Sequence, residues 1–156
     1  MRTRKSWREK MVNPNLPKVV DIPPNMQKRL GPGTLLIPSP RDVEAVIRSI
    51  PQGEVMTVGR IRERLAAKYA TTSACPLVTG IFVRISAEAA EEEALAGRKA
   101  ITPYWRVVKD DGSLNPKFPG GVERQARRLR AEGLPVLKGR VATRSSLTAQ
   151  AYPSTY

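Results

Sequence analysis

Residues 101–121 read ITPYWRVVKDDGSLNPKFPGG, and the rest of the chain is interpreted as a frame around this stretch. Arg106-Val107-Val108 is typical of a short strand, and Asp111-Gly112 is the two-residue signal of a hairpin turn, after which Leu114 would begin the return strand. The stretch therefore predicts a small β-hairpin that starts beside two large aromatic side chains, Tyr104 and Trp105.

The segments on either side are predicted to be helical. Ser39 and Pro40 favour a helix start, because serine caps the first turn and proline suits the first helical position. Apolar residues follow at helical spacing until Pro51, namely Val43, Val46, Ile47 and Ile50. A last helix is expected between Gly121 and Glu132, with an inward face formed by Val122, Ala126 and Leu129.

Two further helices are expected in between. Thr57 can cap the first, and a residue among 71–73 can cap the second. Their predicted inward faces are Val58, Ile61 and Leu65 in the first helix and Val78, Ile81, Phe82 and Ile85 in the second. Helix, short connection, helix is the helix-turn-helix arrangement, in which the second helix reads DNA. We expect its exposed residues to include Thr72, Ser73, Thr79 and Arg84.

The composition points to a polyanionic partner. The 156 residues contain 27 Lys and Arg against 14 Asp and Glu, which gives a net charge of +13. Nucleic acid is the leading candidate, and a soluble basic protein of another kind is the alternative. One cysteine and no histidine argue against an internal disulfide and the usual zinc sites, so we expect neither metal nor cofactor.

No apolar run approaches the about 20 residues of a membrane span, and the N-terminal residues lack the apolar core of a signal peptide. We therefore expect a cytoplasmic, nucleoid-associated monomer with no membrane partner.

The stretch at 101–121 resembles the active-site segment of the methylguanine-DNA methyltransferases, in which Pro-Cys-His-Arg-Val precedes a hairpin, a Gly-Gly and a helix. Residues 50–66, IPQGEVMTVGRIRERLA, resemble the family's Ile-Pro-x-Gly-x-Val turn and the first helix of its DNA-binding motif. Residues 119–133, PGGVERQARRLRAEG, resemble its Gly-Gly helix. The resemblance implies a mainly α fold with a small β-hairpin, a winged helix-turn-helix domain at 39–133. A basic, proline-rich N-terminal arm (1–38) and a basic C-terminal tail (134–156) would flank it.

Two departures from the family pattern bear on function. Tyr104 stands where the family has its acceptor cysteine, and Trp105 where it has the activating histidine. Alkyl transfer needs an activated sulfur nucleophile. The chain thus resembles the alkyltransferase-like branch, which lacks the acceptor cysteine. The resemblance implies a non-enzymatic sensor that binds alkylated guanine in double-stranded DNA and passes the lesion to a repair protein.

The resemblance also implies site residues. A lesion pocket would be formed by Tyr104, Trp105, Arg106, Phe118, Gly120 and Gly121, where stacking on the rings offsets the cost of extruding a base. Alternatively, the rings pack as core and plug a vestigial site. The implied DNA-binding residues are Thr57, Val58, Thr72, Ser73, Pro76, Leu77, Thr79 and Arg84.

Base extrusion would differ from that of the family. Pro76 stands where the family has an arginine that enters the base stack, and Val58 where it has a tyrosine beside the rotated phosphate. Pro76-Leu77 is a candidate apolar wedge in place of the arginine.

Two other functions stay open at this point. Cys75, at a helix start that lowers a thiol pKa, is a candidate displaced acceptor of an active methyltransferase, although a lone cysteine is more often a buried small hydrophobe. The chain could also be a winged-helix regulator that binds DNA without recognising lesions.

Three segments outside these motifs complete the prediction. Residues 1–38 are interpreted as an extended arm along phosphates, with a packed or disordered tail as the alternative; residues 34–37 are apolar enough for a buried strand. Residues 86–97, SAEAAEEEALAG, predict an acidic helix that faces away from DNA, as a solvated face or a partner-binding surface. The basic tail from Leu134 is a candidate second electrostatic arm.

Overall fold

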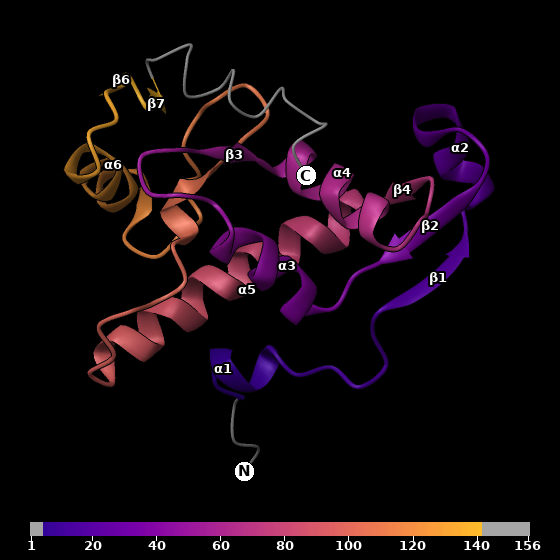
Figure 1. Cartoon of the computed structure of the whole chain (residues 1–156), viewed down its shortest axis with the longest axis horizontal. Helices are drawn as coiled ribbons and strands as arrows, with labels where there is room; N and C mark the ends of the chain where they lie inside the picture. The colour runs from indigo at the N-terminus through magenta and orange to yellow at the C-terminus, as the bar shows by residue number, and fades with distance from the viewer. Residues whose placement is uncertain (1–4, 142–156) are drawn as a thin grey trace.

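The computed structural model describes residues 5–141, and these form a mainly helical protein with three small sheets (Figure 1). The helices are α1 (Trp7–Lys10), α2 (Pro24–Leu30), α3 (Pro40–Arg48), α4 (Val58–Lys68), α5 (Pro76–Leu95), the short 3₁₀ helix η1 (Tyr104–Arg106) and α6 (Gly121–Ala131). The strands are β1 (Lys18–Asp21), β2 (Thr34–Ile37), β3 (Met56–Thr57), β4 (Ser73–Ala74), β5 (Val107–Val108), β6 (Val136–Leu137) and β7 (Arg140–Val141).

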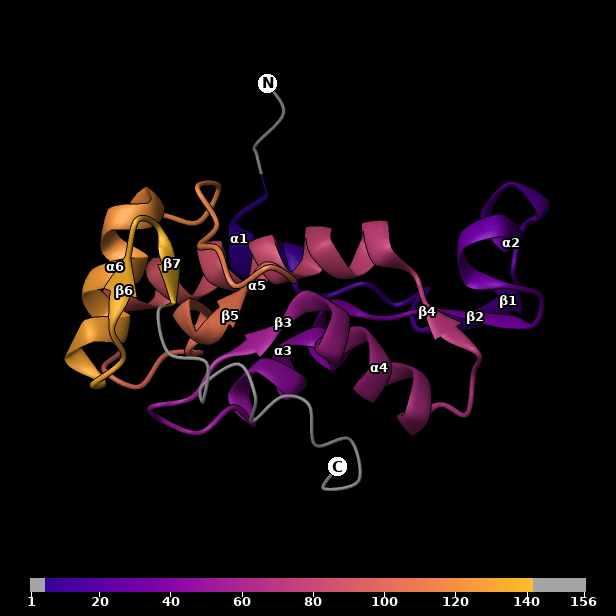
Figure 2. The same cartoon turned by 90° about the horizontal axis from the view of Figure 1, so that it is seen from above.

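Helix α3 begins and packs as predicted. The Ser39 hydroxyl accepts from the Asp42 backbone N–H at 3.1 Å, and the Asp42 carboxylate accepts from the Ser39 N–H at 3.0 Å, which is a capping box. Val43 and Ile47 have no exposed surface. The predicted amphipathic helix is confirmed, and α3 packs against α5 (Figure 2).

The prediction of where α5 begins was wrong. Thr57 does cap α4, but residues 71–73 do not cap the next helix, because this connection joins a sheet. Strand β4 pairs in parallel with β2, and the Cys75 N–H donates to the Leu36 carbonyl at 2.9 Å. The first helical residue is therefore Pro76, with Cys75 as its N-cap.

Helix α5 is a single element of 20 residues, so the acidic segment predicted as a separate helix is its second half. Its buried face also differs from the predicted stripe, because Ile81 is 46% exposed and Val78, Phe82 and Ile85 are only partly buried. Apart from Glu93, the buried residues are small, namely Thr79, Val83, Ser86, Ala87, Ala89 and Ala90. Small side chains let α3 approach closely, which leaves the bulkier ones at the borders of the contact.

The predicted central hairpin is partly right. Strand β5 and the turn at Lys109–Gly112 both exist, the latter closed by a hydrogen bond of 2.8 Å. The return does not pair with β5, however, since β5 pairs in parallel with β3. Instead Leu114 donates to the Gly139 carbonyl at 2.9 Å, so the return joins the β6–β7 hairpin.

That hairpin occupies the first part of the predicted C-terminal tail. Its turn is Lys138-Gly139, both with positive φ, and Val136 and Val141 are buried. Residues 134–141 are therefore packed rather than an arm, and the rest of the predicted tail lies outside the described residues.

The N-terminal segment is also packed where the structure describes it. Strands β1 and β2 pair in antiparallel fashion, with Lys18 opposite Ile37 and Asp21 opposite Thr34. Met11 and Ile22 are each 2% exposed, so apolar residues anchor this segment, and the extended-arm interpretation of residues 5–38 was wrong. Figure 2 shows α2, β1 and β2 at the opposite end of the molecule from α6 and the β6–β7 hairpin.

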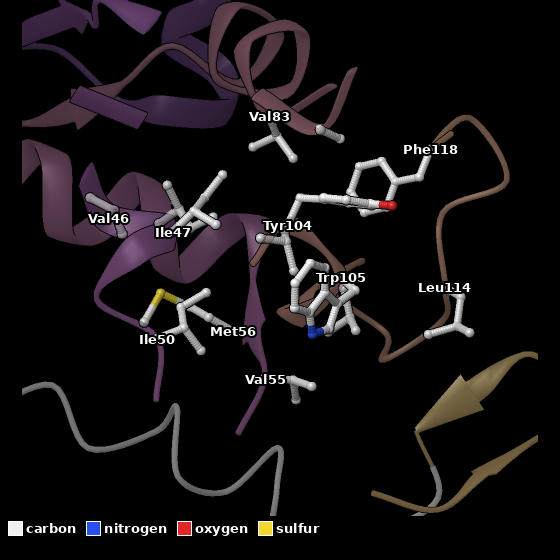
Figure 3. Close-up of a cluster of buried hydrophobic side chains, with 14 of the residues drawn as sticks. Val46, Ile47, Ile50, Val55, Met56, Val83, Tyr104, Trp105, Leu114 and Phe118 are labelled. Carbon is white, nitrogen blue, oxygen red and sulfur yellow. The ribbon is translucent and has the colours of Figure 1, made fainter. Parts of the chain in front are cut away.

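The core lies between α3, α4, α5 and α6 and includes the rings of Tyr104, Trp105 and Phe118 (Figure 3). Within the described residues, none of the helices has the length and apolar character needed to cross a bilayer.

Candidate nucleic-acid interface

The predicted lesion pocket is filled by its own aromatic residues. Tyr104 lies in η1 and has no exposed surface. Its ring centroid is 5.4 Å from that of Trp105 and 5.3 Å from that of Phe118, and both pairs meet edge to face (Figure 3). The structure thus has the closed arrangement that the sequence left as an alternative.

The Tyr104 hydroxyl is bound as well as buried. It donates a hydrogen bond to Glu91 of α5. Glu91 also forms ion pairs with two residues of α6, Arg128 at 2.7 Å and Arg124 at 3.6 Å. Burial and the hydrogen bond to Glu91 raise the pKa of the Tyr104 phenol, so the side chain is neutral at physiological pH.

Trp105 and Arg106 converge on one carboxylate, that of Glu132. The indole N–H donates to Glu132 at 2.9 Å, and the Arg106 guanidinium lies 2.7 Å from it and also donates to the Ile50 carbonyl at 2.7 Å. Burial alone would raise the pKa of Glu132, but the hydrogen bonds from Arg106, Trp105 and the Gly53 N–H outweigh it and lower the pKa. Arg106 is therefore bound inside the protein rather than aimed at a pocket.

The Gly120-Gly121 loop forms the start of α6. Both glycines have positive φ, 76° and 67°, and Gly121 donates to the Phe118 carbonyl at 2.8 Å. Gln125, which the sequence analysis missed, is fully buried and donates to the carbonyls of Trp105 and Val107 at 3.1 and 2.8 Å. Its signal was a polar residue on the inward face of an amphipathic helix.

The acidic half of α5 is not the solvated face that was predicted. Besides the contacts of Glu91, the Glu92 carboxylate accepts from the backbone N–H groups of Trp7 and Arg8, each at 3.1 Å. Glu93 lies 3.5 Å from Arg8 and 3.8 Å from Arg98. These carboxylates therefore hold α1 and α6 against α5.

The other half of α5 borders a groove of about 420 Å³. Two apolar side chains on this side are exposed, Leu77 at 72% and Ile81 at 46%. The groove is lined by Pro76, Leu77, Gly80, Ile81 and Arg84 of α5 and by Lys109, Asn115, Pro116 and Lys117 of the facing loop. Sequence reasoning had proposed Pro76, Leu77 and Arg84 for DNA contact, and it missed the remaining six, most of which come from a loop whose position depends on the tertiary fold.

The other proposed DNA-binding residues do not line this groove. Thr79 is fully buried, so the prediction of its exposure was wrong. The buried face of α5 is displaced by one residue from the predicted face, and this displacement turns Thr79 inward. Thr57 caps α4, and Val58 is partly buried against the core. Thr72 donates its backbone N–H to the Thr34 carbonyl at 3.1 Å, and Ser73 accepts from Arg62 at 3.2 Å.

Cys75 is buried in a separate cluster. It is 7% exposed and packs with Ile22 and Leu35, whereas Tyr104 belongs to the main core. This placement agrees with a buried small hydrophobe.

Comparison with known proteins now identifies the domain. Residues 38–134, more than half of the chain, match the family model described as "6-O-methylguanine DNA methyltransferase, DNA binding domain". The chain belongs to this family. The resemblance found in the sequence is thus confirmed, and the methyltransferase family's DNA-binding domain comprises α3 to α6 of the structure.

No curated protein matches the chain. Among solved structures, it is similar to S. pombe Atl1 in complex with damaged DNA containing O6-carboxymethylguanine, at 18% sequence identity and a TM-score of 0.45, over 69% of this chain and 92% of that chain.

Proposed function

We propose that this protein is a non-enzymatic DNA-binding protein of the alkyltransferase-like kind, which recognises alkylated guanine in double-stranded DNA. The state of Tyr104, which by the sequence resemblance stands at the family's acceptor position, supports the proposal: its neutral phenol is buried and hydrogen-bonded to Glu91. A neutral, enclosed phenol is not a nucleophile for an alkyl group. The one cysteine, Cys75, lies in another cluster.

The groove beside α5 supports DNA as the partner. Leu77 and Ile81 are exposed apolar residues, and the cations Arg84, Lys109 and Lys117 surround them. Apolar wedges with a basic rim are typical of proteins that enter the minor groove and open the base stack. Leu77, the more exposed of the two, is the candidate to fill the space of an extruded base.

The alkylated base would be received in this groove rather than among the three rings, because the rings occupy each other's faces and edges. The volume of about 420 Å³ is within the range of small-molecule sites, roughly 300–1,000 Å³. In this proposal, a monomer at the nucleoid marks the lesion for a repair protein.

The closed aromatic cluster favours a second candidate function. A protein with no room beside Tyr104 could bind DNA through the same groove without distinguishing alkylated from normal guanine. The two functions differ in one measurable quantity, the ratio of affinities for the two duplexes.

The chemical part of the proposal is tested with a duplex whose guanine carries an isotopically labelled methyl group on its exocyclic oxygen. After incubation with excess protein, we expect all label to remain on the DNA. Label recovered on the protein in stoichiometric amount would contradict the proposal, and its loss in Cys75→Ser would identify the displaced acceptor. A cysteine-containing methyltransferase on the same duplex is the positive control.

A further inference from the structure

The acidic residues of this chain are distributed unevenly in space. Residues 22–41 and 64–87 contain no Asp or Glu. The fold brings these two stretches together: β2 pairs with β4, and Met26 and Leu30 of α2 pack on the cluster that contains Cys75 and Val78 at the start of α5. The part of the molecule that these two stretches form, from α2 to the first half of α5, therefore has no carboxylate of its own; the neighbouring β1–β2 hairpin contributes one, Asp21 at the end of β1.

Two cations of α2 are exposed and form no ion pair with a described residue. Helix α2 turns Met26 and Leu30 toward the core, and Lys28, midway between them in sequence, lies on the opposite side of the helix. Lys28 and its neighbour Arg29 are exposed, and neither forms an ion pair within residues 5–141. Arg8, Arg124 and Arg128, in contrast, are neutralised by the carboxylates in the second half of α5.

The position of α2 relative to the groove suggests which molecule these cations bind. The groove begins at Pro76 and Leu77, in the first turn of α5, and α2 packs on the small cluster that contains Cys75, the N-cap of that helix. We propose that α2 and the β1–β2 hairpin form a second DNA contact, in which Lys28 and Arg29 bind phosphates of the duplex that flanks the groove. This inference rests on the proposed DNA binding but is independent of lesion recognition.

The length of the β1–β2 hairpin determines how many base pairs of the duplex this contact covers. Strands of four residues are about 13 Å long at about 3.3 Å per residue, which corresponds to about four base pairs at 3.4 Å each. On one side of the groove site, the bound duplex should therefore extend about four base pairs further than the groove contact alone requires.

The test compares Lys28→Ala/Arg29→Ala with the control Lys99→Ala/Arg127→Ala, which removes the same charge from exposed positions elsewhere. Binding to an unmodified duplex is measured over a series of salt concentrations. For the first variant we expect about tenfold weaker binding at low salt and a slope of log K against log salt reduced by roughly 2, one for each phosphate contact. The control should keep the wild-type slope.

Duplex length gives a second, independent readout. Shortening one flank by four base pairs should weaken DNA binding by the wild-type protein. The same shortening should leave the DNA affinity of the Lys28→Ala/Arg29→Ala variant unchanged. Equal slopes in both variants, or equal sensitivity to the flank, would overturn the second contact. Failure of the wild-type protein to bind any duplex would overturn the proposed function too, whereas equal binding to modified and unmodified DNA would remove lesion recognition alone.

Discussion

The hydroxyl of Tyr104 donates a hydrogen bond to Glu91, a residue of the acidic half of α5. Glu91 in turn binds Arg128 and Arg124 of α6, so Tyr104 and Glu91 together link α5 to α6. Tyr104 therefore contributes both ring packing and a polar network to the folded protein.

Replacing Tyr104 should separate these two contributions. Tyr104→Ala removes a fully buried ring and should lower the free energy of unfolding by about 3–5 kcal/mol. Tyr104→Phe keeps the ring and loses only the hydrogen bond, so we expect a loss of about 1 kcal/mol. Chemical denaturation of both variants checks this order, and equal losses would contradict a role for the ring in the core.

Glu132 should make stability depend on pH in the acid range. Because its pKa is lowered in the folded protein, its contribution is fully present above the unfolded value, near 4.5, and is lost as the pH falls through the folded pKa. Glu132→Gln should therefore flatten this part of the pH profile and cost about 3 kcal/mol at neutral pH, since the buried Arg106 loses its negatively charged partner and an amide NH2 replaces one of the two acceptor oxygens. Glu123→Gln, an exposed change on the same element, should leave the profile as in the wild type.

Thr79 was predicted to be exposed on the DNA-contacting surface, and the structure buries it. Its hydroxyl is buried and has no hydrogen-bond partner among the described residues. Thr79→Val has nearly the same shape and removes this unpaired group, so stability should be unchanged or higher by about 1 kcal/mol. DNA affinity should also be unchanged, and a large loss of affinity with intact folding would return Thr79 to the DNA-contacting surface.

Leu77 should matter for DNA and not for folding. Because it is 72% exposed, Leu77→Ala should leave the melting temperature within about 1 °C of the wild type. If Leu77 is inserted into the base stack, we expect about tenfold weaker DNA binding, measured by fluorescence anisotropy. Leu95→Ala, at a position that is 92% exposed at the far end of α5, is the matched control. Identical affinities of the two variants would rule out the wedge.

Cys75 should be protected in the native protein. It is 7% exposed, so a thiol reagent should modify it slowly under native conditions and rapidly after denaturation. Rapid native modification would reopen the possibility of Cys75 as an alkyl acceptor.

Local sequence signals predicted the helices that have clear caps. Ser39 with Asp42 and Thr57 with Arg60 close the first turns of α3 and α4 where their residue types indicated. The start of α5 was missed because Ser73, one of the predicted cap residues, and its neighbour Ala74 pair with a strand almost 40 residues earlier. Such a long-range pairing leaves no mark in the local sequence.

The site was harder to predict than the fold for the same physical reason. Leu77 and Arg84 could be placed on a recognition helix from spacing, but Lys109 and Lys117 reach the same groove through a loop. Whether Tyr104 lines a pocket or fills it depends on how its ring meets Phe118, and this depends on the conformation of the Gly120-Gly121 turn.

Recognition of alkylated guanine is measured by the ratio of dissociation constants for two duplexes that differ only in that alkyl group. Both are titrated with wild-type protein at one salt concentration, with Leu77→Ala beside it. We predict at least about tenfold tighter binding to the alkylated duplex, equivalent to about 1.4 kcal/mol, and a smaller ratio in the variant. Equal dissociation constants for the wild-type protein would contradict lesion recognition and leave a winged-helix protein that binds DNA of either kind.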